Sequence, residues 1–420
     1  MKKRISMALA MATAATMATV SVPAMAADDV NITIFNSKME VQSQFEEKAA
    51  EYSEETGVGV EVYYSSDTVA AHLATKYSAN DPYTLAMVDP KDIYSLAKDH
   101  AIDLSDQDWV KETDYAIGID DQINGFPTCV EARGLIYNAD AIEAITGEKF
   151  NPEDYKTLDA FKELLETLKK GGMETPTGIM KEDWSLEAHF LTQVYEEQPD
   201  VEEFISELHE GKADLINNEK FNSLMDFFDV MMENNYAKDS AIAAERETTE
   251  MMLAEGQIAF MFGGNWDWSV LNAYDYSENM GMMPVPQNTD DGSNEKLVGG
   301  GSKFFMIDSS DATSDEQRQA AKDFLTWLAD SEEGQSFIVN DCALIPAFSN
   351  NKLEVADPLG KSVKEYADAG QLIGTYNYMP DDSISVCGAI CQKYLAGQID
   401  RAEFASEIED YWKNTAPVEH

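Results

Sequence analysis

The chain has 420 residues and a formal net charge of −48 at pH 7, because 78 acidic residues face only 30 basic ones. So acidic a surface repels phosphate backbones, which excludes nucleic acid as a partner. A hydrophobic content of 44% argues against disorder, and a chain of this length can build two or more hydrophobic cores.

The first residues predict a signal peptide over residues 1–26. A basic start precedes an apolar run that ends at Ala24-Met25-Ala26, a small-x-small cleavage pattern. We therefore expect cleavage after Ala26 and a secreted, extracytoplasmic protein, in the periplasm or at the cell surface. No lipid-anchor cysteine follows the cleavage site, and no later apolar run approaches the ~20 residues that a membrane span needs.

Strand and helix patterns alternate at the start of the mature chain. Val30–Phe35 and Val58–Tyr64 have strand patterns on either side of a helical pattern over Met39–Glu55. This order predicts a β-α-β unit, which builds a parallel sheet. A helix over Thr68–Ser78 and a strand over Tyr83–Val88 continue the alternation.

The pattern changes in the middle of the chain. Gly125–Asn138 holds two strand-like pieces around the polar residues Glu131 and Arg133, and helical patterns then dominate from Asp140 to Asn235. A long helical block inside an α/β pattern predicts a second domain inserted into the first. Further on, Gly299–Ser302 predicts a close-approach turn before a strand.

A strand, a glycine pair and a tryptophan follow one another after residue 257. Ile258–Phe262 predicts a buried strand that Gly263-Gly264 ends, and Asn265 can cap a following helix. Trp266 is thereby held at a strand end, where open α/β sheets bind ligands. We interpret Trp266 as a ligand platform and Trp268 as a core residue.

Short polar residues follow the other predicted strands in the same way. Asn36 and Ser37 come after the first strand, Ser65 after the second and Asp89 after the third. Aromatic faces beside amides and carboxylates suit a sugar, whose C–H face packs on a ring and whose hydroxyls both donate and accept hydrogen bonds. These strand ends therefore predict a sugar site.

Catalytic and metal-binding signatures are missing from the sequence. It contains no G-x-S-x-G, H-E-x-x-H, G-x-x-x-x-G-K-[ST] or G-x-G-x-x-G pattern. The five histidines are scattered, and the cysteines lack zinc-site spacing, so we predict neither a metal nor a cofactor. The cysteines are Cys129, Cys342, Cys387 and Cys391.

Several motifs stand in a fixed order along the chain. They include Phe35-Asn-Ser-Lys38, Phe126-Pro-Thr-Cys-Val-Glu-Ala132, Gly256-Gln-Ile-Ala-Phe-Met261, Gly264-Asn-Trp266, Ile345-Pro-Ala347 and Tyr378-Met-Pro-Asp381. This order resembles that of the extracytoplasmic carbohydrate-binding proteins of ABC transporters, the maltose-binding-protein-like group. The likeness covers essentially the whole mature chain.

The resemblance implies an α/β periplasmic-binding-protein fold with two lobes and a hinge, each lobe a mainly parallel sheet flanked by helices. The first lobe would comprise residues 27–130 and about 290–340, and the second residues 131–289 and about 341–420. The resemblance implies ligand binding at Asn36, Ser37, Asp89, Lys91, Glu131, Trp184, Trp266, Gly300, Gly301, Asp381 and Asp382. Ser65, predicted from its position after the second strand, completes the set of expected ligand residues.

We therefore predict high-affinity capture of a carbohydrate, an oligosaccharide, by a monomeric protein whose lobes close on it. Delivery to an ABC-transporter permease would follow, and the protein would not be an enzyme. Two alternatives stay open. A secreted enzyme that degrades or modifies polysaccharides would need only two carboxylates at a set separation, and a binder of another solute, such as a polyamine or a peptide, would fit the negative charge.

Overall fold

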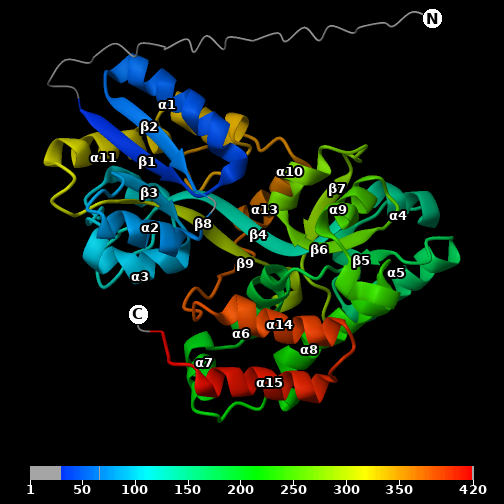
Figure 1. The fold of residues 1–420 in the computed structure, drawn as a ribbon. Helices are drawn as coiled ribbons and strands as arrows, with labels where there is room; N and C mark the ends of the chain where they lie inside the picture. The colour runs from blue at the N-terminus through cyan, green and yellow to red at the C-terminus, as the bar shows by residue number, and fades with distance from the viewer. Residues whose placement is uncertain (1–29, 66, 419–420) are drawn as a thin grey trace, which may run out of the picture.

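The computed structural model describes residues 30–65 and 67–418 and shows two α/β lobes (Figure 1). The predicted signal peptide and its cleavage after Ala26 lie outside these residues. In the described part of the chain, the strands form one nine-stranded sheet in the order β2-β1-β3-β8-β4-β6-β5, with β7 paired to β4 and β9 to β8. The strands are β1 (Asn31–Asn36), β2 (Gly59–Tyr64), β3 (Leu85–Val88), β4 (Phe126–Asn138), β5 (Thr177–Gly178), β6 (Phe260–Gly264), β7 (Met280–Met283), β8 (Leu297–Ile307) and β9 (Leu372–Ile373).

The first lobe is built on the β-α-β unit that the alternating pattern predicts. β1 pairs in parallel with both β2 and β3, so Ile34 lies opposite Val62 on one side and Leu85 on the other. Gly57 ends the first helix with a φ of 78°, a left-handed conformation that glycine adopts without a steric penalty. The helices of this lobe include α1 (Gln42–Thr56), α2 (Val69–Ser78), α3 (Pro90–His100) and α11 (Asp315–Asp330).

The long strands β4 and β8 run between the two lobes (Figure 1). They pair antiparallel from Phe126↔Phe305 to Arg133↔Val298. Two sequence predictions are wrong here, because β4 is one continuous strand and Gly299–Ser302 lies inside β8 rather than in a turn. Glu131 and Arg133 do not interrupt β4, because each pairs with a residue of opposite charge. Gly299 allows β8 to lie close to β4, since a Cβ at this position would come 2.4 Å from the carbonyl oxygen of Glu131.

The sheet of the second lobe is mixed rather than mainly parallel. β4 enters this lobe from the hinge and pairs antiparallel with β6 and β7, while β5 pairs in parallel with β6. The predicted helical block covers this sheet, which confirms the two-lobe α/β fold. The remaining α-helices of the described chain are α4 (Ala139–Thr146), α5 (Leu158–Lys170), α6 (Thr192–Glu196), α7 (Val201–His209), α8 (Glu219–Glu233), α9 (Arg246–Ala254), α10 (Trp268–Leu271), α12 (Glu332–Ser336), α13 (Pro358–Asp368), α14 (Ser383–Leu395) and α15 (Arg401–Asn414).

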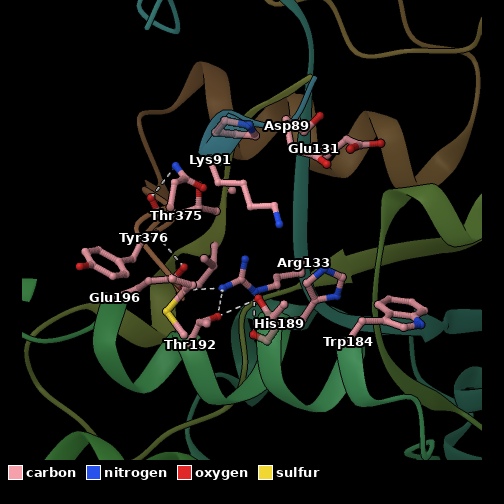
Figure 2. Close-up of a pocket in the computed structure, with 18 of the residues that line it drawn as sticks. Asp89, Lys91, Glu131, Arg133, Trp184, His189, Thr192, Glu196, Thr375 and Tyr376 are labelled. Atoms are coloured by element: carbon pink, nitrogen blue, oxygen red, sulfur yellow. Dashed lines mark hydrogen bonds and ion pairs between the residues drawn. The ribbon is translucent and has the colours of Figure 1, made fainter. Parts of the chain in front are cut away.

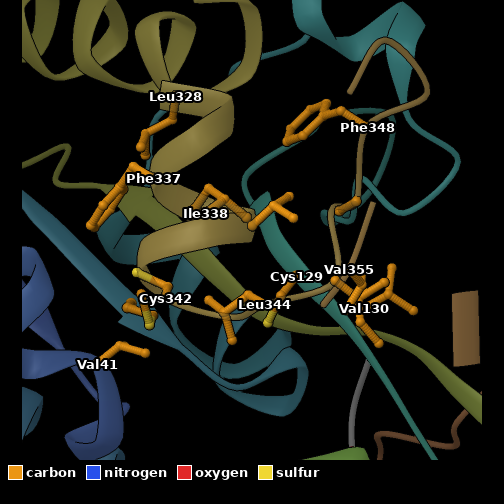
Figure 3. Close-up of a cluster of buried hydrophobic side chains, with 14 of the residues drawn as sticks. Val41, Cys129, Val130, Leu328, Phe337, Ile338, Cys342, Leu344, Phe348 and Val355 are labelled. Carbon is orange, nitrogen blue, oxygen red and sulfur yellow. The ribbon is translucent and has the colours of Figure 1, made fainter. Parts of the chain in front are cut away.

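Buried apolar side chains support both lobes and the hinge strands between them. Cys129 and Val130 of β4 belong to the cluster that also contains Phe337 and Ile338 (Figure 3). All four cysteines are buried and free. None of the helices in the described residues has the length and apolar composition that crossing a bilayer would require. The residue boundaries that the resemblance implies for the lobes stay a prediction.

Candidate ligand-binding site

A cavity of about 420 Å³ lies beside β4 and β8, with walls from both lobes. The first turn of α3 lines it from the first lobe, and the π-helix Ser185–Leu191 and the segment Thr375–Ile384 line it from the second. Its volume falls within the range of small-molecule sites, about 300–1,000 Å³. Among the residues described here, no three His, Cys, Asp or Glu side chains gather in a way that could hold a metal ion.

The cavity brings together eight of the twelve predicted ligand residues. They are Asp89, Lys91, Glu131, Trp184, Trp266, Gly300, Gly301 and Asp381. The lining therefore unites positions that are distant in sequence, and ligand contact by each of them remains a proposal.

The other four predicted residues, Asn36, Ser37, Ser65 and Asp382, do not line the cavity. Asn36 is fully buried, and its amide donates a hydrogen bond to the carbonyl of Lys38 at 2.8 Å, so it holds the turn after β1. Asp382 accepts a hydrogen bond from the hydroxyl of Tyr411 at 2.8 Å. Strand-end position alone therefore does not place a polar residue in this cavity.

Two tryptophans and a histidine stand next to one another in the cavity lining. The ring of His189 lies 5.2 Å from that of Trp184 and 4.7 Å from that of Trp266, measured between centroids. Gly264 makes room for the tryptophan that follows it, because a Cβ at this position would come 2.2 Å from the Trp266 ring. The result is a continuous aromatic surface on the side of the second lobe.

The residues before Trp266 act differently from the sequence prediction. Gly263 and Gly264 belong to strand β6 instead of ending it. Asn265 does not cap a helix, because its side chain accepts a hydrogen bond from the backbone N–H of Ala132 at 2.9 Å. This bond ties the turn that carries Trp266 to the hinge strand β4.

An ion pair behind the aromatic surface holds it in place. Asp267 is 1% exposed and accepts hydrogen bonds from Arg246 Nε at 3.0 Å and Nη2 at 2.7 Å. It also accepts one from the backbone N–H of Gly264 at 3.0 Å. The guanidinium of Arg246 lies 4.5 Å from the ring centre of Trp184, a cation–π contact that fixes this second tryptophan.

Two carboxylates of the cavity wall are held by lysines, of which Lys38 is buried and Lys303 is half-buried. Glu131 Oε1 lies 2.9 Å from Nζ of Lys38, and Asp89 pairs with Lys303 of β8. Burial lowers the pKa of Lys38, but nearby negative charge, above all that of Glu131, outweighs this effect, so its pKa is raised. The carboxylate of Glu131 is therefore fixed at the wall by a permanent cation.

Arg133 is the main lining residue that the sequence analysis did not propose as a site residue. Its Nε donates to the carbonyl of His189 at 2.7 Å, its Nη2 donates to Thr192 Oγ1 at 2.9 Å, and it pairs with Glu196 (Figure 2). Burial raises the pKa of Glu196, while Arg133 acts in the opposite direction. The sequence could have indicated Arg133, because residues two positions apart in a strand lie on the same face and Glu131 was already predicted as a ligand residue.

An aromatic contact joins the two lobes near the cavity. Tyr94 of α3 meets Tyr378, which follows β9, with ring centroids 4.5 Å apart. Since α3 belongs to the first lobe and Tyr378 leads into α14 of the second, this contact forms only when the lobes are close to each other.

Comparison with known proteins identifies the family. A family model described as bacterial extracellular solute-binding protein matches residues 47–369, well over half of the 420 residues. The chain belongs to this family. Among curated proteins, none matches the sequence of this solute-binding protein significantly.

Solved structures of binding proteins share the fold of this solute-binding protein. MsmE from Bacillus subtilis, in an open conformation, has a TM-score of 0.73 at 18% identity, covering 92% of this chain and 97% of that chain. Apo RafE from Streptococcus pneumoniae has a TM-score of 0.73 at 18% identity, and the match covers 93% of this chain and 98% of RafE. A sugar transporter protein from Bacillus licheniformis has a TM-score of 0.66 at 19% identity, covering 91% and 99%. At these identities the likeness establishes the fold.

One buried carboxyl group should make the stability of this solute-binding protein depend on pH. Glu187 in the π-helix is fully buried, and burial raises its pKa to about 7, partly opposed by Ser383 and Arg133 and reinforced by Glu196 and Asp183. The folded state therefore keeps a proton that the unfolded chain releases at lower pH. Its stabilising contribution is complete below the ordinary glutamate pKa and is lost as the pH rises through about 7.

Glu187→Gln should remove this part of the pH dependence. Each proton bound only by the folded state changes the free energy of unfolding by at most about 1.4 kcal/mol per pH unit. Urea unfolding between about pH 5 and pH 8 measures the slope in the wild type and in the variant. Equal slopes in the two proteins would contradict a buried proton at Glu187.

Proposed function

We propose that this protein captures a carbohydrate, an oligosaccharide, in the cavity between its lobes and delivers it to the permease of an ABC transporter. The observation that carries the proposal is the pairing of an aromatic surface, Trp184 and Trp266, with fixed polar groups such as Glu131 in one cavity. A sugar ring can pack its C–H face on such a surface while its hydroxyls bond to the polar groups.

The similar structures support the carbohydrate. RafE was solved in complex with raffinose, and the Bacillus licheniformis protein in complex with stachyose. Another structure with this fold is a chitin oligosaccharide-binding protein. Membership of an extracellular solute-binding family supports a role in uptake outside the cytoplasm, which is where a permease would receive the sugar.

Closure of the lobes would follow from the distribution of the contacts. Asp89 and Lys91 line the cavity from the first lobe, and Trp184 and Trp266 line it from the second. A ligand that touches both sets binds the closed state more tightly and so shifts the population toward it. The contact between Tyr94 and Tyr378 would further stabilise the closed state.

Trp266→Ala should weaken sugar binding by at least about tenfold. An aromatic stacking contact is worth about 0.5–1.5 kcal/mol beyond the buried area, and the variant loses both. A thermal-shift screen of oligosaccharides identifies a ligand first, because a ligand that binds the folded state raises its melting temperature. Calorimetry with that ligand then gives the affinity of each variant.

Trp268→Ala is the matched control. This tryptophan lies two positions further along, packs against Tyr276 with ring centroids 4.9 Å apart and does not line the cavity. Its removal should cost stability but leave the affinity nearly unchanged. Unchanged sugar affinity in Trp266→Ala would contradict the proposed stacking of the sugar on Trp266.

Binding without turnover separates the proposal from the enzyme alternative. The wild-type protein, as a monomer, should return a labelled oligosaccharide intact after prolonged incubation. Release of shorter products, checked by chromatography and abolished in Trp266→Ala, would favour the secreted enzyme instead.

A further inference from the structure

One lysine that lines the cavity forms no salt bridge with any residue in 30–65 or 67–418. Lys91 is exposed at the start of α3 and lines the cavity, and it takes part in no ion pair with the residues that the structure describes. Figure 2 shows its amino group pointing into the cavity, toward the guanidinium of Arg133. Two cations thus face the same space from different elements.

The inner carboxylates of the cavity are already paired with other cations. Asp89 pairs with Lys303, Glu131 lies 2.9 Å from Nζ of Lys38, and Glu196 pairs with Arg133. These carboxylates therefore do not neutralise Lys91. The remaining acidic lining residues are Glu187, which is fully buried, and Asp381, which is exposed on the turn before α14.

Arg133 keeps donor capacity that faces the cavity. Its hydrogen bonds to the protein use Nε and Nη2, toward His189, Thr192 and Glu196. The two N–H groups of Nη1 are left for other acceptors. An anion placed between Nη1 and Lys91 would accept charge-assisted hydrogen bonds from both groups and give Lys91 a partner of opposite charge.

We propose that the ligand is an acidic oligosaccharide whose carboxylate or sulfate group binds between Lys91 and Arg133. The inference rests on the proposed function, because it assumes a sugar in this cavity. An acidic group would also bridge α3 of the first lobe and the Arg133–Glu196 pair, which anchors β4 to the second lobe. Its charge therefore contributes to closure as well as to recognition.

The test uses the full mature protein and a panel of oligosaccharides in matched sets: neutral, with one uronic acid, and with one sulfate. Calorimetry should show that an acidic member binds at least about tenfold more tightly than its neutral counterpart. Lys91→Met should weaken binding of that acidic sugar about tenfold or more, since it removes a hydrogen bond to a charged group. The uronic acid and sulfate sets tell which anion is bound.

Lys98→Met is the control, because this lysine is exposed on the same helix but does not line the cavity. Its affinity for the acidic sugar should equal that of the wild type. A neutral sugar that binds as tightly as its acidic counterparts, with no effect of Lys91→Met, would overturn the inference and leave the proposed function intact. A panel in which no sugar binds would overturn both.

Discussion

Replacing Gly300 by leucine should abolish sugar binding and leave the protein folded. Gly300 of β8 lies opposite Glu131 of β4, so side chains at the two positions project from the same face of the sheet. Both residues line the cavity. Apart from Gly300 itself and its two chain neighbours, no heavy atom of the described residues lies within 4 Å of the position that a Cβ of Gly300 would take, so the strand can accept a side chain there.

The leucine would occupy space that the sugar needs, in a cavity of only about 420 Å³. We expect calorimetry to show at least a hundredfold loss of affinity, about 3 kcal/mol, with little change in melting temperature. Retained affinity would mean that the ligand does not bind in this cavity.

Gly299→Ala provides the opposite control. A Cβ at this neighbouring position would come 2.4 Å from the carbonyl oxygen of Glu131 and 2.5 Å from Cβ of Ala132. The crowded strand pair should cost about 1–3 kcal/mol of stability, measured by urea unfolding. Gly299 also lines the cavity, but its added Cβ would press on β4 rather than fill open space, so the main expected effect of this variant is on stability.

The elements of the first lobe could be predicted because each has a local signal. Alternation marks β1 and β2, and a left-handed glycine, Gly57, ends the helix between them. The course of β4 could not be predicted in the same way. Its continuity depends on partners distant in sequence, since Glu131 pairs with Lys38 and Arg133 with Glu196.

The same limit explains which site residues could be found. Trp266 could be found from the sequence because a strand pattern and two glycines precede it, although the two glycines belong to the strand and do not form a turn. Asn36 met the strand-end rule equally well, yet its amide is used to hold a turn. Local pattern identifies side chains that suit a sugar, whereas the tertiary fold decides which of them reach the cavity.

Arg133→Met should destabilise the protein by about 3–5 kcal/mol at neutral pH, the usual cost of leaving a buried charge without its partner. The side chain of Arg133 is 6% exposed and that of Glu196 is 2% exposed. Without the guanidinium, the Glu196 carboxylate keeps the backbone N–H of Tyr376 as a donor at 3.0 Å. One hydrogen bond does not replace the lost cation.

The pH dependence of this loss distinguishes a stranded charge from poor packing. Burial raises the pKa of Glu196 even in the wild type, and the loss of Arg133 removes a group that lowers it. The folded variant should therefore bind a proton at Glu196 and regain stability as the pH falls, with the largest deficit above the raised pKa. Arg133→Met combined with Glu196→Gln removes the charge altogether. Urea unfolding should show that this double variant recovers much of the loss near pH 8 and little near pH 5, whereas equal deficits at both pH values would assign the effect to packing.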